Sequence, residues 1–213
     1  RVVVGAHFFT DIIGGVIVSY ICFKISKHML QKYMPAESLI GSFALINNKF
    51  VLTIVVVFLF MLLLSVGPTL DIYISSLFYY GKNQFLLQSY YDITVLFRKI
   101  LLRLVIIYIL ILPIISIFFP IKQLYFGYKF KIKDLVFLWF SVFLNLVIVV
   151  NLFFKNLWGR ARPDDVLQLG GEETFTAWFQ ISDACARNCS FVSGDATVGF
   201  SIIVFYFLIK KNI

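Results

Sequence analysis

The chain has 213 residues, of which 61% are hydrophobic and only 14% are charged, and its mean hydropathy is +0.92. A soluble core of this length cannot bury so much apolar surface, so the composition excludes an ordinary soluble domain and indicates that a lipid bilayer surrounds much of the chain. The net charge of +8 does not indicate a nucleic-acid partner, because the lysines lie at the ends of apolar stretches, where they orient membrane helices.

Five apolar stretches are each near the ~20 residues that a helix needs to cross the hydrocarbon core. In chain order they are residues 8–25, 51–68, 101–119, 135–154 and 192–209. We expect Pro68 and Pro120 to end two of these helices and Pro113 to kink the third. The sequence therefore predicts an all-α, polytopic transmembrane helix bundle that forms a single membrane domain.

The lysines assign the two sides of this bundle. They follow the first and last stretches and crowd the segment 121–134, so the positive-inside rule makes these ends cytoplasmic. The segments 71–98 and 155–189 then lie on the outer side, and they contain most of the acidic residues. The arginines are all assigned to the outer side as well, so their placement requires a local explanation.

Three cations begin the second outer segment, where a helix leaves the membrane. Lys155, Arg160 and Arg162 fall within eight residues. One reading is structural, because basic side chains at helix ends often only extend to lipid headgroups. The other reading is a phosphate site, because arginine presents a planar fork of donors to phosphate oxygens and lysine adds a point charge.

Ser193 and Gly194 open the last apolar stretch. Backbone N–H groups at the start of a helix favour an anion, and the Ser193 hydroxyl is a further donor. The alternative reading is an ordinary helix cap, made by Ser193 or by Asp195.

The first residues of the chain hold a third candidate. His7 and Asp11 are four residues apart and therefore share one face of a helix. A carboxylate in this place can hold the imidazole proton on one nitrogen and leave the other nitrogen as a nucleophile. A histidine near a helix start is often structural, but the neighbouring aspartate at the membrane edge favours the functional reading.

These residues and their spacing resemble the type 2 phosphatidic acid phosphatase family, which are membrane lipid phosphatases related to vanadium haloperoxidases. The family pattern is a lysine, six residues and Arg-Pro; then Pro-Ser-Gly-His; then Ser-Arg, five residues, a histidine, three residues and an aspartate. The motifs are matched, the second only in part, by Lys155, Arg162 and Pro163, by Ser193 and Gly194, and by Arg1, His7 and Asp11. The segment 71–80 also looks like bacterial members of the family.

The resemblance implies a mechanism without a metal or a cofactor. The family histidine attacks phosphorus and forms a phosphohistidine, a role that falls on His7, and its paired aspartate is Asp11. The family's phosphate-binding groups correspond here to Arg1, Lys155, Arg162, Ser193 and Gly194. The implied enzyme is a phosphoric monoester hydrolase acting on phosphatidate, undecaprenyl pyrophosphate or lipid A, from a site on the periplasmic face of the bacterial inner membrane.

The sequence departs from the family pattern in two ways. Asp195 stands where the family has the histidine that protonates the leaving alcohol, so it is a weak acid catalyst, an orienting group or a sign of reduced activity. Bacterial members similar to lipid A phosphatases also carry an acidic residue there, which points to that subgroup. The motif order differs too: residues 1–33 match the last family segment, residues 34–50 are a cytoplasmic connection, and residues 51–213 match the first four family helices.

Five spans of an expected six are therefore predicted. The chain is either a reordered version of the family sequence or an incomplete fragment of a tandem protein, in which His7 and Lys155 would belong to different sites. Two other function classes stay open, a non-catalytic lipid-phosphate-binding relative and a transporter. The ionisable residues argue against a transporter, because they gather at one edge of the membrane, while Asn145 is the main polar residue deep in a span.

Cys185 and Cys189 lie in the second outer segment. In an oxidising periplasm we expect them to form a disulfide that makes this segment rigid. Cys22 falls within the first predicted helix, and we expect it to be an inert, small apolar residue.

Overall fold

The computed structural model describes residues 2–33, 69–82, 84–87, 90–119 and 130–202, together with residues 52, 55, 56 and 59. Throughout these residues the regular structure is helical, and the extended pairings are isolated bridges. The predicted all-α class is confirmed. The predicted connection 34–50, most of the stretch 51–68 and the end of the last stretch lie outside the described residues.

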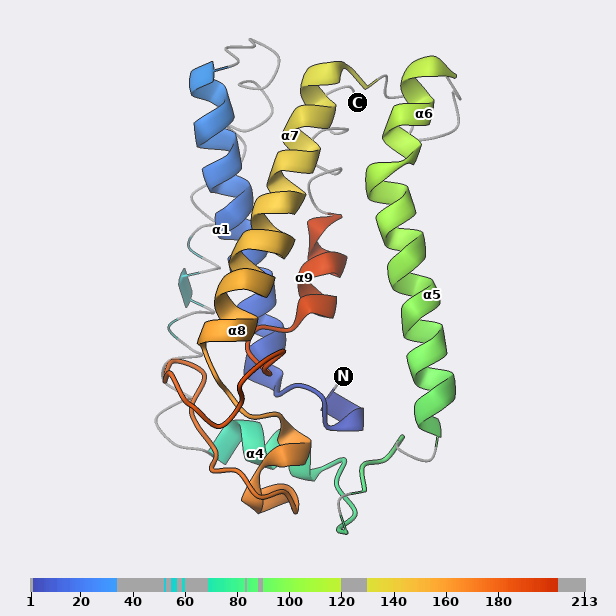
Figure 1. The fold of residues 1–213 in the computed structure, drawn as a ribbon. Helices are drawn as coiled ribbons and strands as arrows, with labels where there is room; N and C mark the ends of the chain where they lie inside the picture. Colours follow the sequence, from blue (N-terminus) through green and yellow to red (C-terminus); the bar gives the residue numbers. More distant parts are fainter. Residues whose placement is uncertain are drawn as a thin grey trace.

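The first long helix, α1 (Phe9–Tyr33), packs most extensively against three other elements of the bundle. They are α9 (Gly194–Ser201), α7 (Ile132–Val142) and the π-helix η4 (Phe143–Phe154), and Figure 1 shows α1 beside α7 and α9. The helix α1 continues to Tyr33, so the predicted stretch 8–25 ends too early. The beginning of α1 is its outer end. This end places the first residues of the chain against the start of α9.

Two adjacent glycines allow the close contact between α1 and α9. A Cβ atom on Gly15 would lie 2.9 Å from the Ser193 carbonyl oxygen and 2.9 Å from the Thr197 hydroxyl oxygen. A Cβ atom on Gly14 would lie 2.8 Å from the Phe191 ring. Small residues let membrane helices approach at backbone distance, so this pair fixes how near α9 comes to α1.

The rod formed by α5 (Tyr91–Leu110) and α6 (Leu112–Phe118) is broken at Ile111. Pro113 lies in the first turn of α6, where its missing N–H is tolerated, so the interruption falls beside the proline at which a kink was predicted. The helix begins at Tyr91 and not near residue 101, so the last part of the predicted outer segment 71–98 is helical. The apolar stretch ends at the charged pair Arg98 and Lys99, whereas the helical backbone continues beyond this pair toward the outer end.

The third long rod runs without interruption through α7, η4 and α8 (Lys155–Leu157). Asn145 is buried at its centre, and its Nδ2 group donates to the hydroxyl oxygens of Ser19 at 3.0 Å and Ser201 at 3.3 Å. The polar residue predicted deep in a span thus links three helices of the bundle, as polar side chains do in a membrane interior.

Three helical rods of the described chain are long and apolar enough to cross a membrane. They are Phe9–Leu30, Tyr91–Phe118 and Ile132–Leu157, and they correspond to three of the five predicted stretches. The short helix α9 begins the last predicted stretch, which continues beyond the described residues. The chain is therefore a multi-pass membrane protein.

The polar segments gather at one end of these rods, the lower end in Figure 1. This end carries α4 (Thr69–Ser76), α8, the short helices η1 (Val2–Val4), η5 (Pro163–Asp165) and η6 (Leu167–Leu169), and the loop before α9. They close over a small apolar core of Phe8, Phe85, Ala161, Val166 and Leu169. Gly159 makes a tight turn here at φ 68°, where a Cβ atom would lie 1.6 Å from the Ser182 carbonyl oxygen.

Candidate active site

A cavity of about 300 Å³ opens at the polar end of the bundle. Its wall combines residues that are far apart in sequence, from the first residues, α5, α8, the following loop and α9. The predicted site residues His7, Lys155, Arg162, Gly194 and Asp195 line it, and so do Arg98 and Asp164. The first and third motifs, which lie at opposite parts of the sequence, therefore meet in one cavity of this chain. Arg1 lies outside the described residues.

His7 is buried beside this cavity with only 1% of its surface exposed. Its Nδ1 atom lies 2.8 Å from the backbone carbonyl oxygen of Ser190, which can only accept a hydrogen bond. Nδ1 therefore carries the proton, and Nε2 is the basic nitrogen of the ring. This is the tautomer that a histidine nucleophile requires.

Asp11 acts on His7 less directly than the sequence predicts. Its Oδ2 atom is 3.8 Å from Nδ1 of His7, too far for a hydrogen bond, and the Ser190 carbonyl takes the imidazole proton. The same carboxylate oxygen accepts the N–H of Phe8 at 2.8 Å and the hydroxyl of Ser190. Asp11 thus holds the backbone on both sides of the histidine contact, because its carboxylate is shared among several donors.

The strongest partner of Asp11 is Arg160, which is fully buried. The Arg160 guanidinium donates to Asp11 at 2.5 Å and to Asp71 at 2.8 Å, and it lies 4.4 Å from the centre of the Phe8 ring. The sequence grouped Arg160 with the phosphate-binding cations. The structure separates it from them, because it turns inward and neutralises two buried carboxylates.

Asp71 was not predicted as a site residue, and it holds the start of α1 in place. Its carboxylate accepts the Thr10 N–H at 3.0 Å and also the Thr10 hydroxyl. A carboxylate at a helix start satisfies N–H groups that have no partner within the helix. The only signal for this role in the sequence is the likeness of the segment 71–80 to bacterial members of the family.

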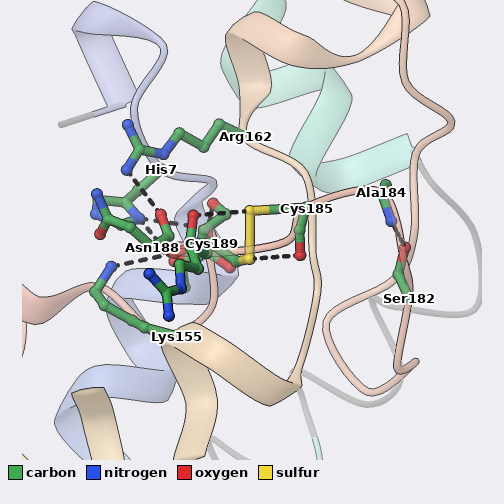
Figure 2. Close-up of a disulfide and its surroundings, with 11 residues drawn as sticks. His7, Lys155, Arg162, Ser182, Ala184, Cys185, Asn188 and Cys189 are labelled. Carbon is green, nitrogen blue, oxygen red and sulfur yellow. Dashed lines mark hydrogen bonds and ion pairs between the residues drawn. A yellow bond between two sulfur atoms is a disulfide. The ribbon is translucent and has the colours of Figure 1, made fainter. Parts of the chain in front are cut away.

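Lys155 and Arg162 are both anchored by backbone carbonyl groups at the cavity wall. The ammonium group of Lys155 donates to the Cys189 carbonyl oxygen at 3.1 Å, and Nη2 of Arg162 donates to the Asn188 carbonyl oxygen at 2.8 Å. The two side chains come from different elements and approach the same backbone segment, at Asn188 and Cys189 (Figure 2). The two cations predicted to bind phosphate therefore flank the same cavity as His7.

The second motif is divided between a cap and the cavity. Ser193 is buried at the start of α9, where its Oγ atom accepts from the Ala196 N–H at 3.5 Å and its own N–H donates to the Asp11 carbonyl oxygen at 3.0 Å. This geometry corresponds to the alternative reading of Ser193 as a helix cap. Gly194 does line the cavity, and a Cβ atom there would touch the Lys155 side chain at 3.4 Å.

Asp195 forms an ion pair with Arg98, a residue that sequence reasoning did not single out. Nη1 of Arg98 lies 3.2 Å and 3.3 Å from the two carboxylate oxygens of Asp195, and both residues line the cavity. Arg98 therefore contacts both oxygens of the Asp195 carboxyl group within the cavity wall. An arginine in the outer turns of a largely apolar helix was the available signal for Arg98.

The charges of the cavity favour an anionic ligand. Arg98, Lys155 and Arg162 contribute three cations beside His7, and the carboxylates of Asp164 and Asp195 are the opposing charges in the wall. Among the residues that the structure describes, no cluster of three or more His, Cys, Asp or Glu side chains is placed to hold a metal ion. Side-chain cations such as Arg98, Lys155 and Arg162 can bind phosphate oxygens electrostatically.

His7 and the described cations Arg98, Lys155 and Arg162 lie in one cavity of this helical membrane bundle, an arrangement that suits a membrane phosphatase acting on phosphoric monoesters. Comparison with known proteins agrees. The chain is 36% identical over 159 residues to the lipid A 4′-phosphatase of Francisella tularensis subsp. novicida (strain U112), a match that covers 73% of this chain and 69% of that relative. The chain therefore belongs to the same family as this relative, the type 2 phosphatidic acid phosphatase family, within its lipid A phosphatase-like group.

Two further relatives match a shorter part of the chain. Lipid A 4′-phosphatases of Rhizobium etli and Rhizobium leguminosarum are each 33% identical over 72 residues, which is 33% of this chain and 28% and 31% of those relatives. No protein-family model matches the chain, and no solved structure matches it.

Proposed function

We propose that this chain removes a phosphate monoester from a lipid A-type glycolipid through a covalent intermediate on His7. The observation that carries the proposal is the cavity in which a histidine of fixed tautomer lies with Arg98, Lys155 and Arg162. The lipid A 4′-phosphatases to which the chain is similar supply the substrate class.

In the first step, Nε2 of His7 attacks phosphorus, and the bond between phosphorus and the sugar oxygen breaks. The Nδ1–H group remains hydrogen-bonded to the Ser190 carbonyl oxygen. This contact stabilises the positive charge that develops on the imidazole ring. Lys155, Arg162 and Arg98 bind the phosphate oxygens. Arg98 is included because it lines the same cavity as His7, Lys155 and Arg162. The leaving alkoxide takes its proton from a solvent water molecule, and the hydroxide that remains is neutralised by the proton that Asp195 takes up in the second step, which returns Asp195 to its starting form.

In the second step, a water molecule attacks the phosphohistidine and inorganic phosphate leaves. Asp195 lines the cavity in its carboxylate form and accepts a proton from this water. The proposal therefore assigns Asp195 to the hydrolysis of the intermediate and not to protonation of the leaving alcohol. It also explains how an acidic residue can replace the family histidine without loss of activity.

A lipid substrate agrees with the surroundings of the cavity. Tyr91 lines it and is 52% exposed, and the opposite side of the same turns of α5 carries the exposed apolar residues Ile93 and Phe97. A glycolipid could place its sugar phosphate in the cavity while its acyl chains remain in the bilayer next to α5. With the orientation that the lysines predict, the site faces the periplasm from the inner membrane.

The test is phosphate release by the purified chain in detergent micelles containing lipid A, phosphatidate or undecaprenyl pyrophosphate. We expect release from lipid A, and we expect His7→Asn to abolish it. His28→Asn is the matched control, because His28 is exposed near the opposite end of α1 and should be dispensable. Release that survives His7→Asn would contradict the proposal.

A non-catalytic lipid-phosphate binder is the second candidate, and Asp195 in the place of the family histidine is the observation in its favour. It predicts saturable binding of lipid A that requires Lys155 and Arg162 but produces no phosphate. Equilibrium binding measured on the same samples therefore separates the two functions.

A further inference from the structure

Three consecutive backbone carbonyl groups hold three different side chains of the cavity. The Asn188 carbonyl oxygen accepts from Arg162 at 2.8 Å, the Cys189 carbonyl oxygen accepts from Lys155 at 3.1 Å, and the Ser190 carbonyl oxygen accepts from His7 at 2.8 Å. Figure 2 shows these side chains converging on the one segment. The segment Asn188–Ser190 thus sets the positions of the proposed nucleophile and of two phosphate-binding cations together.

The inner side of this segment is fixed to the body of the protein by hydrogen bonds. The Cys189 N–H donates to the Lys155 carbonyl oxygen at 3.1 Å, and the Ser190 N–H donates to the Arg160 carbonyl oxygen at 2.9 Å. The Ser190 hydroxyl donates to Asp11. One of these bonds holds Cys189 and two hold Ser190, but none of them restrains Asn188.

The outer side of the segment is restrained by a covalent bond. Cys185 and Cys189 form a disulfide with their Cα atoms 5.6 Å apart, as expected from the sequence, and it closes a turn in which Asn188 adopts φ 54°. This left-handed conformation is one that asparagine tolerates better than most residues. The turn between the two cysteines is exposed, whereas Cys189 is fully buried. The disulfide therefore ties an exposed turn to the carbonyl groups that hold Arg162 and Lys155.

We propose that the Asn188–Ser190 segment is the positioning element of the site, and that the Cys185–Cys189 disulfide keeps it in place, so that turnover depends on the oxidised state of this pair. The inference rests on the proposed phosphatase function. Because the cations and the nucleophile are held by adjacent carbonyl groups, a shift of this backbone moves all of them at once. A displacement of about 1 Å at a reacting group is enough to cost on the order of 100-fold in rate.

Reduction opens the disulfide in a balanced reaction. A dithiol reductant supplies two electrons and two protons, the S–S bond becomes two thiols, and the reductant leaves as its own disulfide. Cys185 is partly exposed, so a small reductant can reach the bond. The helical rods contain no part of this pair and are expected to remain folded.

The experiment compares the full chain in detergent with the disulfide intact, after reduction, and after reoxidation, with thiols counted by mass spectrometry. We expect reduction to lower kcat about 10-fold or more with a smaller change in KM, and reoxidation to restore it. The double variant Cys185→Ser/Cys189→Ser should have the kcat of the reduced protein, and adding the reductant should not change it. Cys22→Ala is the matched control, because Cys22 is a buried cysteine of α1 far from the cavity, and it should respond as the unaltered chain does.

Two results would overturn the inference. One is an unchanged kcat in protein whose two thiols are shown to be free. The other is loss of helical circular dichroism on reduction, which would make the disulfide a support of the fold and not of the site. If the oxidised chain releases no phosphate from any lipid, the proposed function fails first, and orthovanadate binding becomes the readout. Tighter vanadate binding by the oxidised form would then support the positioning role, and equal binding would reject it.

Discussion

Arg160 and Arg162 are two residues apart, and the structure predicts opposite consequences for their removal. The Arg160 guanidinium is fully buried between Asp11, at 2.5 Å, and Asp71, at 2.8 Å. Removing one partner of a buried ion pair costs about 3–5 kcal/mol, because the other charge is left without compensation. Arg160→Met leaves two such carboxylates, so we expect a cost near the top of this range, ~5 kcal/mol.

This free energy can be read as a melting temperature. In proteins of this size about 1 kcal/mol corresponds to 2–4 °C, so Arg160→Met should melt about 10–20 °C below the unaltered chain in the same detergent. Arg160→Lys should recover only part of the loss, because one ammonium group cannot bridge two carboxylates as a planar fork does. Circular dichroism or a thiol-independent fluorescence assay measures these shifts.

Arg162→Met is the matched comparison. Arg162 lines the cavity and donates to the Asn188 carbonyl, so its loss should leave the melting temperature within about 2 °C while kcat/KM falls roughly 100-fold, the usual effect of one lost transition-state donor. The reasoning would be refuted if Arg160→Met melted like the unaltered chain, or if the two variants lost equal stability.

Three further outcomes follow from the geometry. Arg98→Met should lower kcat/KM about 10- to 100-fold in phosphate-release assays, because one of three cavity cations is lost; unchanged kinetics would remove Arg98 from the site. Asp195→Asn should let the covalent intermediate accumulate, visible as a burst of released alcohol, because the proposed proton acceptor is absent; a linear time course would contradict that role. Gly159→Ala should lower the melting temperature by several degrees in thermal scans, because the added methyl would lie 1.6 Å from the Ser182 carbonyl oxygen; an unchanged melting curve would show that the turn can relax.

The parts that sequence reasoning predicted well rest on strong, local signals. Composition and long apolar stretches were enough for an all-helical membrane protein. Motif spacing singled out His7, Lys155 and Arg162, which line one cavity, but it left open whether His7 and Lys155 share a site. The family itself was also identified from these residues, and the Francisella relative confirms it. Membrane helices suit such reasoning, because bilayer thickness and the cost of unpaired backbone groups leave few alternatives.

The parts that sequence reasoning missed depend on which direction a side chain takes. Lys155, Arg160 and Arg162 are equivalent by charge and spacing, yet Arg160 points inward because Asp11 and Asp71 meet there. Asp71 belongs to a different helix, and the local pattern of residues 155–162 does not predict its contact with Arg160. Tertiary pairing therefore decided the role of each cation.

Two other differences have the same origin. Asp11 was expected to hold the imidazole proton, and the Ser190 carbonyl does so because the loop before α9 returns to the first helix, 183 residues away in sequence. Arg98 was placed in a loop, because hydropathy cannot distinguish a charged residue that ends a helix from one that faces a polar cavity on its side. Contacts between distant segments carry no signal in a single sequence.

The most direct test of the proposed mechanism is to identify the residue that carries the phosphoryl group. The purified chain would be mixed with lipid A labelled in its phosphate, quenched at alkaline pH, which preserves phosphohistidine, and digested for mass spectrometry. We expect the label on the peptide that contains His7, with none on His28 and none in the His7→Asn variant. Label on any other residue, or phosphate release with no labelled peptide and no effect of His7→Asn, would contradict the assignment of His7 as the nucleophile.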